Sequence, residues 1–596
     1  MFYPEKMSRV TIVSPKTYLK SVIDVLYELK VLHINDYLPK EGIGIGTPLK
    51  DAEKVSKLIL DLQSIRFLLE MPNISTKKKM TLKEIESYLK DLKSQVPAIS
   101  NKISKFNEAL KMVQKRREEL EFLSDAGIKD LESLESLDNF EMIFGYTADI
   151  EKLKNMKDVQ VFHSKKATKV HPVAILVKKG KKLNVKIDEI YISVRGKGKV
   201  EEKINQAVRE IEDLSNKKKD AEKEMKKIAE KHGGTLNYVE VMLLEKIKKS
   251  EAPLKFASSE YAFLVNGWIP EKNEDALIKK ITEISNNIFV KFEKPSEEDE
   301  VPTKINNPAL VKPYQFFLNL YSIPSYREID PSFLIFLTFP LFYGFILGDV
   351  GYGAILLAIG LIMRVKTKHA LIDILIMSSI TTMMFGFIFG EAFGAEEIFG
   401  YHLSPYINRI HDINQLMIVS AAIGLVHINL GFVFGFINEY HHHGLTKAIM
   451  AKMSWIGVQI AVILFALNSL GYTSINIYII AAIGIASFLM IVKAEGMFGI
   501  VELPSLISNV LSYLRLAAVG LASAALAIVV NDFAGKFFAT GGIMMVAGVI
   551  TLVVGHGINF ALGILGAFLH SMRLHYVEMF TKFYGGSGKE YEPFGE

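Results

Sequence analysis

Arg515 stands inside an apolar segment that is long enough to cross a lipid bilayer. The segment reads SNVLSYLRLAAVGLASAALAIVV and covers residues 508–530. Lipid tails cannot solvate a guanidinium, and an arginine at the centre of a span costs about 2.5–3.5 kcal/mol on insertion scales. Ionisable residues at such positions generally serve ion or substrate pathways, so Arg515 is the first candidate for a functional residue.

Polar residues precede Arg515 on one face of the same predicted helix. At 100° per residue they fall within about 80° of one another, and they are Glu502, Ser505, Asn509 and Ser512. A polar stripe that begins at one membrane surface and stops at a buried charge is typical of an aqueous access path that ends inside the membrane.

The last apolar segment carries a second arginine and further polar residues. Arg573 follows His570 by three residues, so the two share a helix face, and Glu578 comes next. Nearer the opposite surface, His556 and Asn559 are also one helical step apart. The two segments together predict polar access from each side of the membrane, with an arginine between the two paths.

Residues 326–596 read as a membrane domain made of helices. A window of about twenty residues predicts eight spans, near 332–349, 351–364, 370–392, 415–437, 454–471, 475–493, 498–531 and 543–580. The seventh would reach about 50 Å at ~1.5 Å per residue, against a hydrocarbon core of ~30 Å. The eighth is similarly long, so we expect both of these C-terminal helices to tilt steeply or to protrude.

Charged residues in the loops predict the orientation of this domain. Loops 364–369 and 438–452 carry excess Lys and Arg, whereas loops 394–414, 471–474 and 532–542 are acidic or nearly neutral. The positive-inside rule then places the large N-terminal region on the cytoplasmic side. Eight spans return the C-terminus to the same side, so we expect a multi-pass protein of the cell membrane.

Residues 1–325 read as a cytoplasmic arm of small α+β lobes joined by long helices. Apolar residues at three- and four-residue spacing among dense charges predict helical stretches near 51–125 and 198–231, which fit an antiparallel coiled coil. We expect a β-α-β lobe before the arm, strands near 140–196 at its globular tip, and another small α/β piece near 261–295. The fold class is therefore mixed, and this half shows no catalytic constellation.

Composition excludes several classes of protein. The 596 residues contain no cysteine, which removes disulfides, thiol catalysis and Cys-ligated zinc. A net charge of +5 is too small for a chain of this length to indicate nucleic acid. The charged, strand-like start MFYPEKMSRVTIV argues against a cleaved signal peptide. Residues 441–443 are adjacent histidines that point in divergent directions, so we expect no metal site and no cofactor.

The C-terminal motifs resemble a known family. LSYLRLAAVGLASAALA (511–527) and LHSMRLHYVEMFTKFYGGSGKEYEPF (569–594) resemble the a/I subunit family of rotary V-type ATPases and archaeal A-type ATP synthases. Shorter matches run through the chain, namely NGWIP (266–270), YSIPSYREIDPS (321–332), PLFYGFILGDVGYGA (340–354) and FGFIFGEAFG (385–394). With its compact loops, the chain resembles the archaeal or bacterial subunit I more than the eukaryotic form.

The resemblance implies an ion-translocating stator, which is no enzyme by itself but a non-catalytic subunit of a rotary motor for ion transport and ATP synthesis. Arg515 would face a carboxylate on the rotating proteolipid (c/K) ring and separate two half-channels, with Arg573 assisting. A ring carboxylate beside an arginine prefers to be ionised, so it would release its ion there. The implied partners are the ring, the peripheral stalk subunits, the central stalk connector, the ATP-binding head through the stalks, and the lipid bilayer.

The lining of the half-channels departs from the eukaryotic pattern. Ser523 stands where those relatives have a histidine, Glu502 matches a family glutamate only approximately, and Gly563 replaces a carboxylate. The remaining candidates to supply the missing polarity are His556, Asn559, His427 and Glu391.

Plainer roles compete for most of these residues. Arg515 could form a structural ion pair inside its own bundle, Arg573 could snorkel to the interface, and His427 could be a hydrogen-bonded core histidine. Glu391 lies near the end of its span, where either role fits, and Glu578 could pair with a lysine one turn later.

Two other functions compete for the whole chain. One is a secondary ion transporter with a large cytoplasmic regulatory domain, which would predict two repeated halves with interrupted helices at the membrane centre. We see no such repeat. The other is a membrane anchor that does not conduct. The sequence leaves H⁺ and Na⁺ both open as the coupled ion.

Overall fold

The computed structural model describes residues 3–39, 43–69, 80–134, 139–156, 159–163, 171–180, 183, 185–398 and 401–596. Contacts divide the chain into two compact units. One is Ile45–Lys255, and the other combines Met1–Gly44 with Phe256–Glu596.

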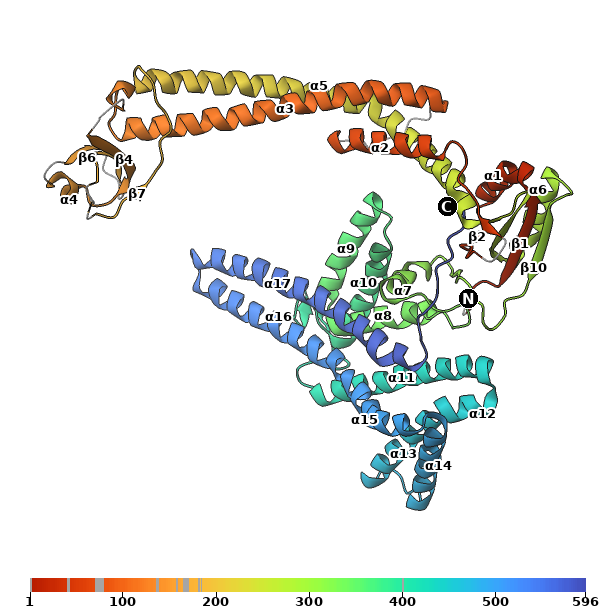
Figure 1. The fold of residues 1–596 in the computed structure, drawn as a ribbon. Helices are drawn as coiled ribbons and strands as arrows, with labels where there is room; N and C mark the ends of the chain where they lie inside the picture. Colours follow the sequence, from red (N-terminus) through yellow and green to blue (C-terminus); the bar gives the residue numbers. More distant parts are fainter. Residues whose placement is uncertain are drawn as a thin grey trace. The chain divides into compact units, whose positions relative to one another are not determined.

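The unit Ile45–Lys255 is built on helices that share one apolar seam. Its helices α2 (Ala52–Leu68), α3 (Leu82–Asp125) and α5 (Val200–Glu251) pack together, and α3 and α5 run side by side (Figure 1). Buried residues recur on α3 at three- and four-residue spacing, at Ile85, Leu89, Leu92, Val96 and Ile99. The first four of them meet buried residues of α5 in one apolar core, which explains why both predicted stretches are helical. A supercoil between them stays a prediction.

Helix α5 continues to Glu251, well beyond the predicted end near 231. The pair Gly233-Gly234 favours a break, because each glycine costs a helix about 1 kcal/mol relative to alanine. Buried Leu236, Val239 and Leu243 continue the apolar spacing past the pair and join the core formed with α2 and α3. Tertiary packing therefore outweighs local propensity here. Residues 70–79 of the first predicted stretch lie outside the described residues.

The tip of this unit is an antiparallel sheet in the order β5-β6-β4-β7. Its elements are β4 (Phe140–Thr147), α4 (Ile150–Lys154), β5 (Val159–His163), β6 (His171–Lys178) and β7 (Asp188–Glu189). Buried Glu119 of α3 accepts hydrogen bonds from the backbone N–H groups of Ser193 and Val194, at 2.7 and 3.0 Å. This carboxylate fixes the strand-to-helix connection to the end of α3.

In the other unit, the two α/β pieces predicted as separate lobes form one sheet. Strand β1 (Met7–Pro15) lies between β9 (Ala262–Pro270) and β10 (Phe289–Glu293), antiparallel to both. The short strands of this sheet are β2 (His33–Ile34), β3 (Gly44–Ile45) and β8 (Ala257–Ser258). The strand order is β10-β1-β9-β8-β3, and β2 also pairs with β9. Helices α1 (Leu19–Leu29) and α6 (Glu274–Ile284) pack together. The expectation of a separate piece near 261–295 was wrong, because sequence periodicity does not identify strand partners.

The remainder of this unit consists mainly of apolar helices around one large core. They are α7 (Gln315–Tyr321), α8 (Ser332–Leu347), α9 (Val350–Lys366), α10 (Ala370–Phe389), α11 (Ile413–His443), α12 (Leu445–Ala448), α13 (Ser454–Ser469), α14 (Ile477–Glu495), α15 (Met497–Ser512), α16 (Leu514–Thr540) and α17 (Met544–Arg573). The short strands β11 (Glu397–Ile398) and β12 (Tyr401–His402) form a hairpin between α10 and α11. Helices α16 and α17 lie side by side (Figure 1).

Among the described residues, six helical segments are long and apolar enough to cross a membrane, and α8 is a shorter apolar helix. The six are Ala370–Phe389, Ile413–His443, Leu445–Ser469, Ile477–Glu495, Met497–Thr540 and Met544–Lys582. The length and apolar composition of these helices are those of a membrane protein. The count of eight spans stays a prediction. The predicted segment 498–531 divides into α15 and α16, and α16 continues to Thr540.

Buried Asn438 of α11 links two connecting segments of this unit. Its side-chain oxygen accepts from the N–H of Ile329 at 3.2 Å, and its amide donates to the carbonyl of Phe583 at 3.0 Å. The chain after α17 then returns to the N-terminal sheet, where the N–H of Phe594 donates to the carbonyl of Leu32 at 2.8 Å.

Candidate functional site

Arg515 follows a break between two helices. Helix α15 ends at Ser512 and α16 begins at Leu514, with Tyr513 in a turn between them. The Tyr513 N–H donates to Val510 at 3.1 Å and its carbonyl accepts from Leu516 at 2.9 Å, which is the tight pattern of a 3₁₀ turn. Arg515 therefore projects from the first turn of a new helix.

Arg573 also ends a regular helix. It is the last residue of α17, and a π-helix, η7 (Leu574–Met579), follows directly. A π-helix widens the turn and changes the direction in which the following side chains point, and such turns are frequent at functional sites. Glu578 lies inside this π-helix and is buried.

The two arginines converge on Glu578. Oε1 of Glu578 lies 3.8 Å from Nη1 of Arg515 and 4.0 Å from Nε of Arg573. The Glu578 side chain is 2% exposed, that of Arg515 21% and that of Arg573 58%. Nη1 of Arg515 and Oε2 of Glu578 have no hydrogen-bond partner among the described residues. Both arginines share one carboxylate there, so one positive charge is left over.

Of the predicted polar stripe, only the end at Ser512 reaches the cluster of Arg515, Arg573 and Glu578 in the described contacts. Ser512 lies within interaction range of the Glu578 carboxylate. Glu502 is exposed, and Ser505 and Asn509 are half-buried. The Ser505 hydroxyl donates to the carbonyl of Glu502 at 2.7 Å, within its own helix. His570 is half-buried one turn before Arg573.

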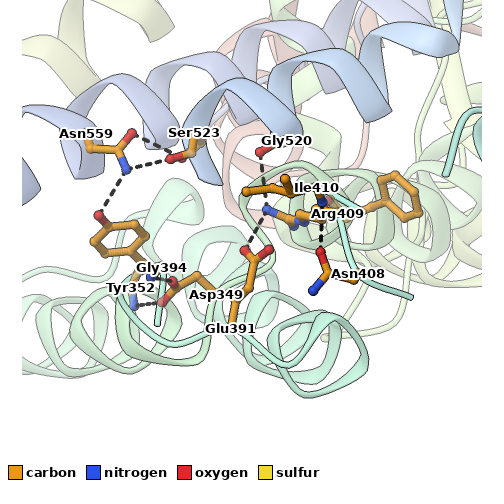
Figure 2. Close-up of polar contacts among 11 residues, drawn as sticks. Asp349, Tyr352, Glu391, Gly394, Asn408, Arg409, Ile410, Gly520, Ser523 and Asn559 are labelled. Carbon is orange, nitrogen blue, oxygen red and sulfur yellow. Dashed lines mark hydrogen bonds and ion pairs between the residues drawn. The ribbon is translucent and has the colours of Figure 1, made fainter. Parts of the chain in front are cut away.

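A second polar cluster lies further along α16 and α17 and contains three predicted residues, Ser523, His556 and Asn559. The Asn559 amide donates to the Ser523 carbonyl and to the Tyr352 hydroxyl, both at 3.0 Å, and the Ser523 hydroxyl donates to the Asn559 side-chain oxygen at 3.2 Å (Figure 2). The Tyr352 hydroxyl lies 2.7 Å from Nδ1 of His556, whose Nε2 lies 2.9 Å from the Asn531 side-chain oxygen. The structure therefore connects the predicted residues through partners from other segments.

Asp349 holds the loop beneath this cluster. Its carboxylate is buried and accepts from the N–H of Tyr352 at 2.9 Å and from the N–H of Gly394 at 3.0 Å (Figure 2). The first of these bonds caps the N-terminus of α9, where an acceptor satisfies a free helix donor. Asp349 thereby orients Tyr352 toward the cluster.

Glu391 takes part in a buried ion pair rather than in either polar cluster. Its Oε2 lies 3.5 Å from Nη1 of Arg409, whose side chain is 1% exposed (Figure 2). Arg409 also donates to the carbonyls of Phe345 and Gly520, at 2.9 and 3.4 Å, and stacks 4.2 Å from the centre of the Phe389 ring. Because the Phe345 carbonyl belongs to the last turn of α8, Arg409 caps that helix. The plainer, structural role considered for Glu391 agrees with this geometry.

His427 is buried in the helix core. Its Nδ1 lies 2.6 Å from the Tyr513 hydroxyl, and its ring centre lies 4.8 Å from that of His575. Nδ1 of His575 donates to the Ser571 carbonyl at 2.7 Å. The described contacts of His427 are those of a hydrogen-bonded core histidine.

Sequence patterns missed Tyr352, Asn531, Tyr513, His575 and Arg409. Tyr513 and His575 each lie two residues from an arginine of the site, and their polar atoms in an apolar span were the signal that could have marked them. Arg409 lies in a loop, where nothing in the local sequence distinguishes a buried arginine from an exposed one. Tyr352 lies within the glycine-rich stretch 348–353, at the start of α9.

Comparisons with known proteins show the family to which the chain belongs. The family model described as V-type ATPase 116kDa subunit family matches residues 141–390 and 503–595, which include both arginines. An A-type ATP synthase subunit I of Archaeoglobus fulgidus is 31% identical over 674 aligned residues, covering 100% of this chain and 99% of the relative. A protein of the same name from Pyrococcus abyssi is 27% identical over 661 residues, covering 100% and 98%.

One solved structure that matches is the cytoplasmic N-terminal domain of subunit I, homolog of subunit a, of V-ATPase. The alignment covers 48% of this chain and 100% of the chain in that structure. Its TM-score of 0.28 and 12% identity are too low to support an argument about the fold. The family match spans more than half of the chain, and the Archaeoglobus relative aligns from end to end. The chain therefore belongs to the V-type ATPase 116kDa subunit family.

Proposed function

We propose that this chain is subunit I of a rotary A/V-type ATP synthase, acting as the ion-translocating stator and not as an enzyme by itself. One observation carries the proposal: Arg515 and Arg573 share one buried carboxylate, that of Glu578. Among the described residues, the pairing leaves one positive charge without a carboxylate, in segments apolar enough to cross a membrane, where an unpaired charge is costly. A carboxylate presented by another subunit is the group that would compensate it.

A rotating ring of proteolipids would supply that carboxylate. Beside Arg515 the ring carboxylate would stay ionised and release its ion, because a nearby cation favours the charged form. The same cation would repel a second cation and prevent a leak between the two sides. Arg573 is more exposed than Arg515 and would assist at the edge of the contact.

Polar groups on each side of Arg515 would form the two half-channels. The path on one side would follow the stripe of Glu502, Ser505, Asn509 and Ser512, which ends beside Glu578. The other path would use the connected cluster of Ser523, Asn559, His556, Tyr352 and Asn531. His570 would line the contact with the ring. We no longer place His427 or Glu391 in either path.

In this proposal the N-terminal lobes and the C-terminus lie in the cytoplasm. The helical arm α3–α5 would reach the peripheral stalks and resist the torque of the rotor. Through the stalks and the central connector, the chain would be linked to the ATP-binding head. The end-to-end similarity to proteins named A-type ATP synthase subunit I supports this assignment.

The test is ATP-driven ion uptake by vesicles that contain the assembled complex, with H⁺ and Na⁺ uptake measured separately. Arg515→Ala should abolish uptake while the complex still assembles and hydrolyses ATP. Arg364→Ala is the matched control, since Arg364 is an exposed arginine paired with Asp373 at 3.1 Å. Near-native uptake by the assembled Arg515→Ala complex would refute the proposed role.

Passive leak provides a second readout. Removing the cation should raise ion flux through the idle Arg515→Ala complex, because the barrier between the paths is lost. Ion transport by the chain alone, without ATP or partner subunits, would instead favour a secondary transporter.

A further inference from the structure

Tyr513 connects the two places where the arginine-bearing helices depart from regular geometry. It forms the turn between α15 and α16, two residues before Arg515. Its hydroxyl lies 3.5 Å from the carbonyl of Leu574, the first residue of the π-helix after Arg573. The shorter contact of the same hydroxyl, at 2.6 Å, is with Nδ1 of His427 on α11.

The His427 ring is itself held from two sides. The Phe342 ring of α8 meets it edge to face with centres 4.8 Å apart, and the His575 ring of the π-helix meets it at the same separation. His575 is further fixed by its bond to the Ser571 carbonyl and lies 2.7 Å from the Thr338 hydroxyl. The atom that receives the Tyr513 hydroxyl therefore has little freedom to move.

Helix α11 leaves space for both irregular turns. A Cβ atom on Gly424 would lie 2.5 Å from Cγ of the Tyr513 ring, closer than real Cβ atoms approach. A Cβ on Gly431, two turns later, would lie 3.1 Å from the carbonyl oxygen of Met579 at the end of the π-helix. The face of α11 that lacks side chains at these positions thus accommodates the aromatic ring and the π-helix.

The arginines do not fix their own spacing. The distances from Glu578 to Arg515 and Arg573, at 3.8 and 4.0 Å, exceed those of hydrogen bonds. Such contacts define neither orientation nor distance closely, so the spacing of the guanidiniums depends on the backbones that carry them. Tyr513 belongs to the backbone that carries Arg515, and its hydroxyl contacts the backbone next to Arg573.

We propose that Tyr513, anchored by His427, is a positioning residue that sets the spacing of Arg515 relative to Arg573 and Glu578. The inference rests on the proposed function, since the spacing matters only if Arg515 must meet a carboxylate on a moving ring. A displaced arginine would still be present and charged. It would meet each ring carboxylate less reliably, and some rotation would occur without ion transfer.

The test compares Tyr513→Phe with Tyr343→Phe in the assembled complex in vesicles. Tyr343 is equally buried in the same core, and its hydroxyl has no hydrogen-bond partner among the described residues. Each variant loses one buried hydroxyl, but only Tyr513→Phe loses the contacts described above. We expect about a tenfold fall in ions moved per ATP hydrolysed for Tyr513→Phe and less than a twofold change for Tyr343→Phe.

Amide hydrogen exchange gives a readout that does not depend on transport. Tyr513→Phe should accelerate exchange in residues 574–579, whereas Tyr343→Phe should leave that segment unchanged. If Tyr513→Phe fails to assemble, His427→Gln and His427→Leu replace it. The glutamine keeps a hydrogen-bonding group near the tyrosine and should retain more coupling than the leucine.

The outcomes separate this inference from the proposed function. Native uptake by Arg515→Ala would refute the function itself. Loss of uptake by Arg515→Ala, together with equal coupling and equal exchange in Tyr513→Phe and Tyr343→Phe, would overturn only the positioning role.

Discussion

Replacing Arg409 should destabilise the membrane part of the chain more than replacing any exposed arginine. The Arg409→Met change retains a long apolar side chain and removes the charge. It leaves the carboxylate of Glu391, whose side chain is 11% exposed, without its partner at 3.5 Å. It also leaves the Phe345 carbonyl without the donor that caps α8 at 2.9 Å.

The expected cost follows from these contacts. Removing one partner of a buried ion pair costs about 3–5 kcal/mol, because the other charge remains buried and uncompensated. Leaving one buried carbonyl unpaired costs about 1–3 kcal/mol. The double variant Arg409→Met/Glu391→Leu removes both charges and should incur mainly the second cost. It should therefore be more stable than Arg409→Met alone by about 3–5 kcal/mol, the cost of the unpaired buried charge.

The assay is unfolding of the purified chain in mixed micelles as the proportion of SDS is raised. Trp455 belongs to the same apolar core as Phe345 and Phe389, and the chain has only two tryptophans. A Trp268→Phe background therefore makes Trp455 fluorescence report on this core. The matched control is Arg364→Met, for which we expect a change below about 1 kcal/mol because its ion pair is exposed.

Two results would refute this reasoning. One is a free energy of unfolding for Arg409→Met within about 1 kcal/mol of that for Arg364→Met, because breaking a desolvated ion pair should cost more than this. The other is a double variant that is no more stable than the single one. In that case the arginine would stabilise the core through its contacts with carbonyls and Phe389, and the charge of Glu391 would be incidental.

Three further predictions concern other parts of the chain. Asn438→Leu should cost about 2–4 kcal/mol in the same micelle assay, because it leaves a buried donor and a buried acceptor unpaired; a smaller loss than for Arg364→Met would contradict this. Thr81→Ala should remove the capping box with Glu84 and destabilise α3 by about 1 kcal/mol. Amide exchange in the first turn of α3 should then be roughly fivefold faster. Unchanged exchange would show that the cap does not stabilise the helix. The backbone N–H and then the hydroxyl of Ser296 donate to Asp299 and lower the pKa of its carboxyl. The stabilisation is therefore complete above the pKa of an unfolded aspartate, about 3.9, and is lost as the pH falls through the lower folded pKa. Amide exchange at Ser296, corrected for its intrinsic pH dependence, should show this loss in the native chain and not in Asp299→Asn.

Periodicity located most secondary structure but not its partners. The alternation in MSRVTIV predicted a strand that the structure has as β1. Its neighbours β9 and β10 lie more than 240 residues further along the chain. In the sheet, Val13 faces Leu264 on one side and Phe289 on the other. Local alternation shows which face of a strand is buried and carries no information on which strand lies next to it. That is why two predicted lobes turned out to be one sheet.

The candidate site divides in the same way. Arg515 and Arg573 were visible in the sequence because charge inside an apolar span is rare. Their meeting at Glu578 was not, because it depends on a turn at Tyr513 and a π-helix after Arg573. Helical projection at 100° per residue assumes regular geometry, and it fails where that geometry changes.

The sequence by itself determined the membrane character of the C-terminal half, the helical arm and the two arginines of the candidate site. Each of these follows from residue type and spacing along one segment. Only the tertiary structure decided which carboxylate the arginines share and which polar residues connect Ser523 with His556. It also decided that Glu391 belongs to a buried pair with Arg409. Those pairings join side chains from distant segments, and they depend on how the helices pack.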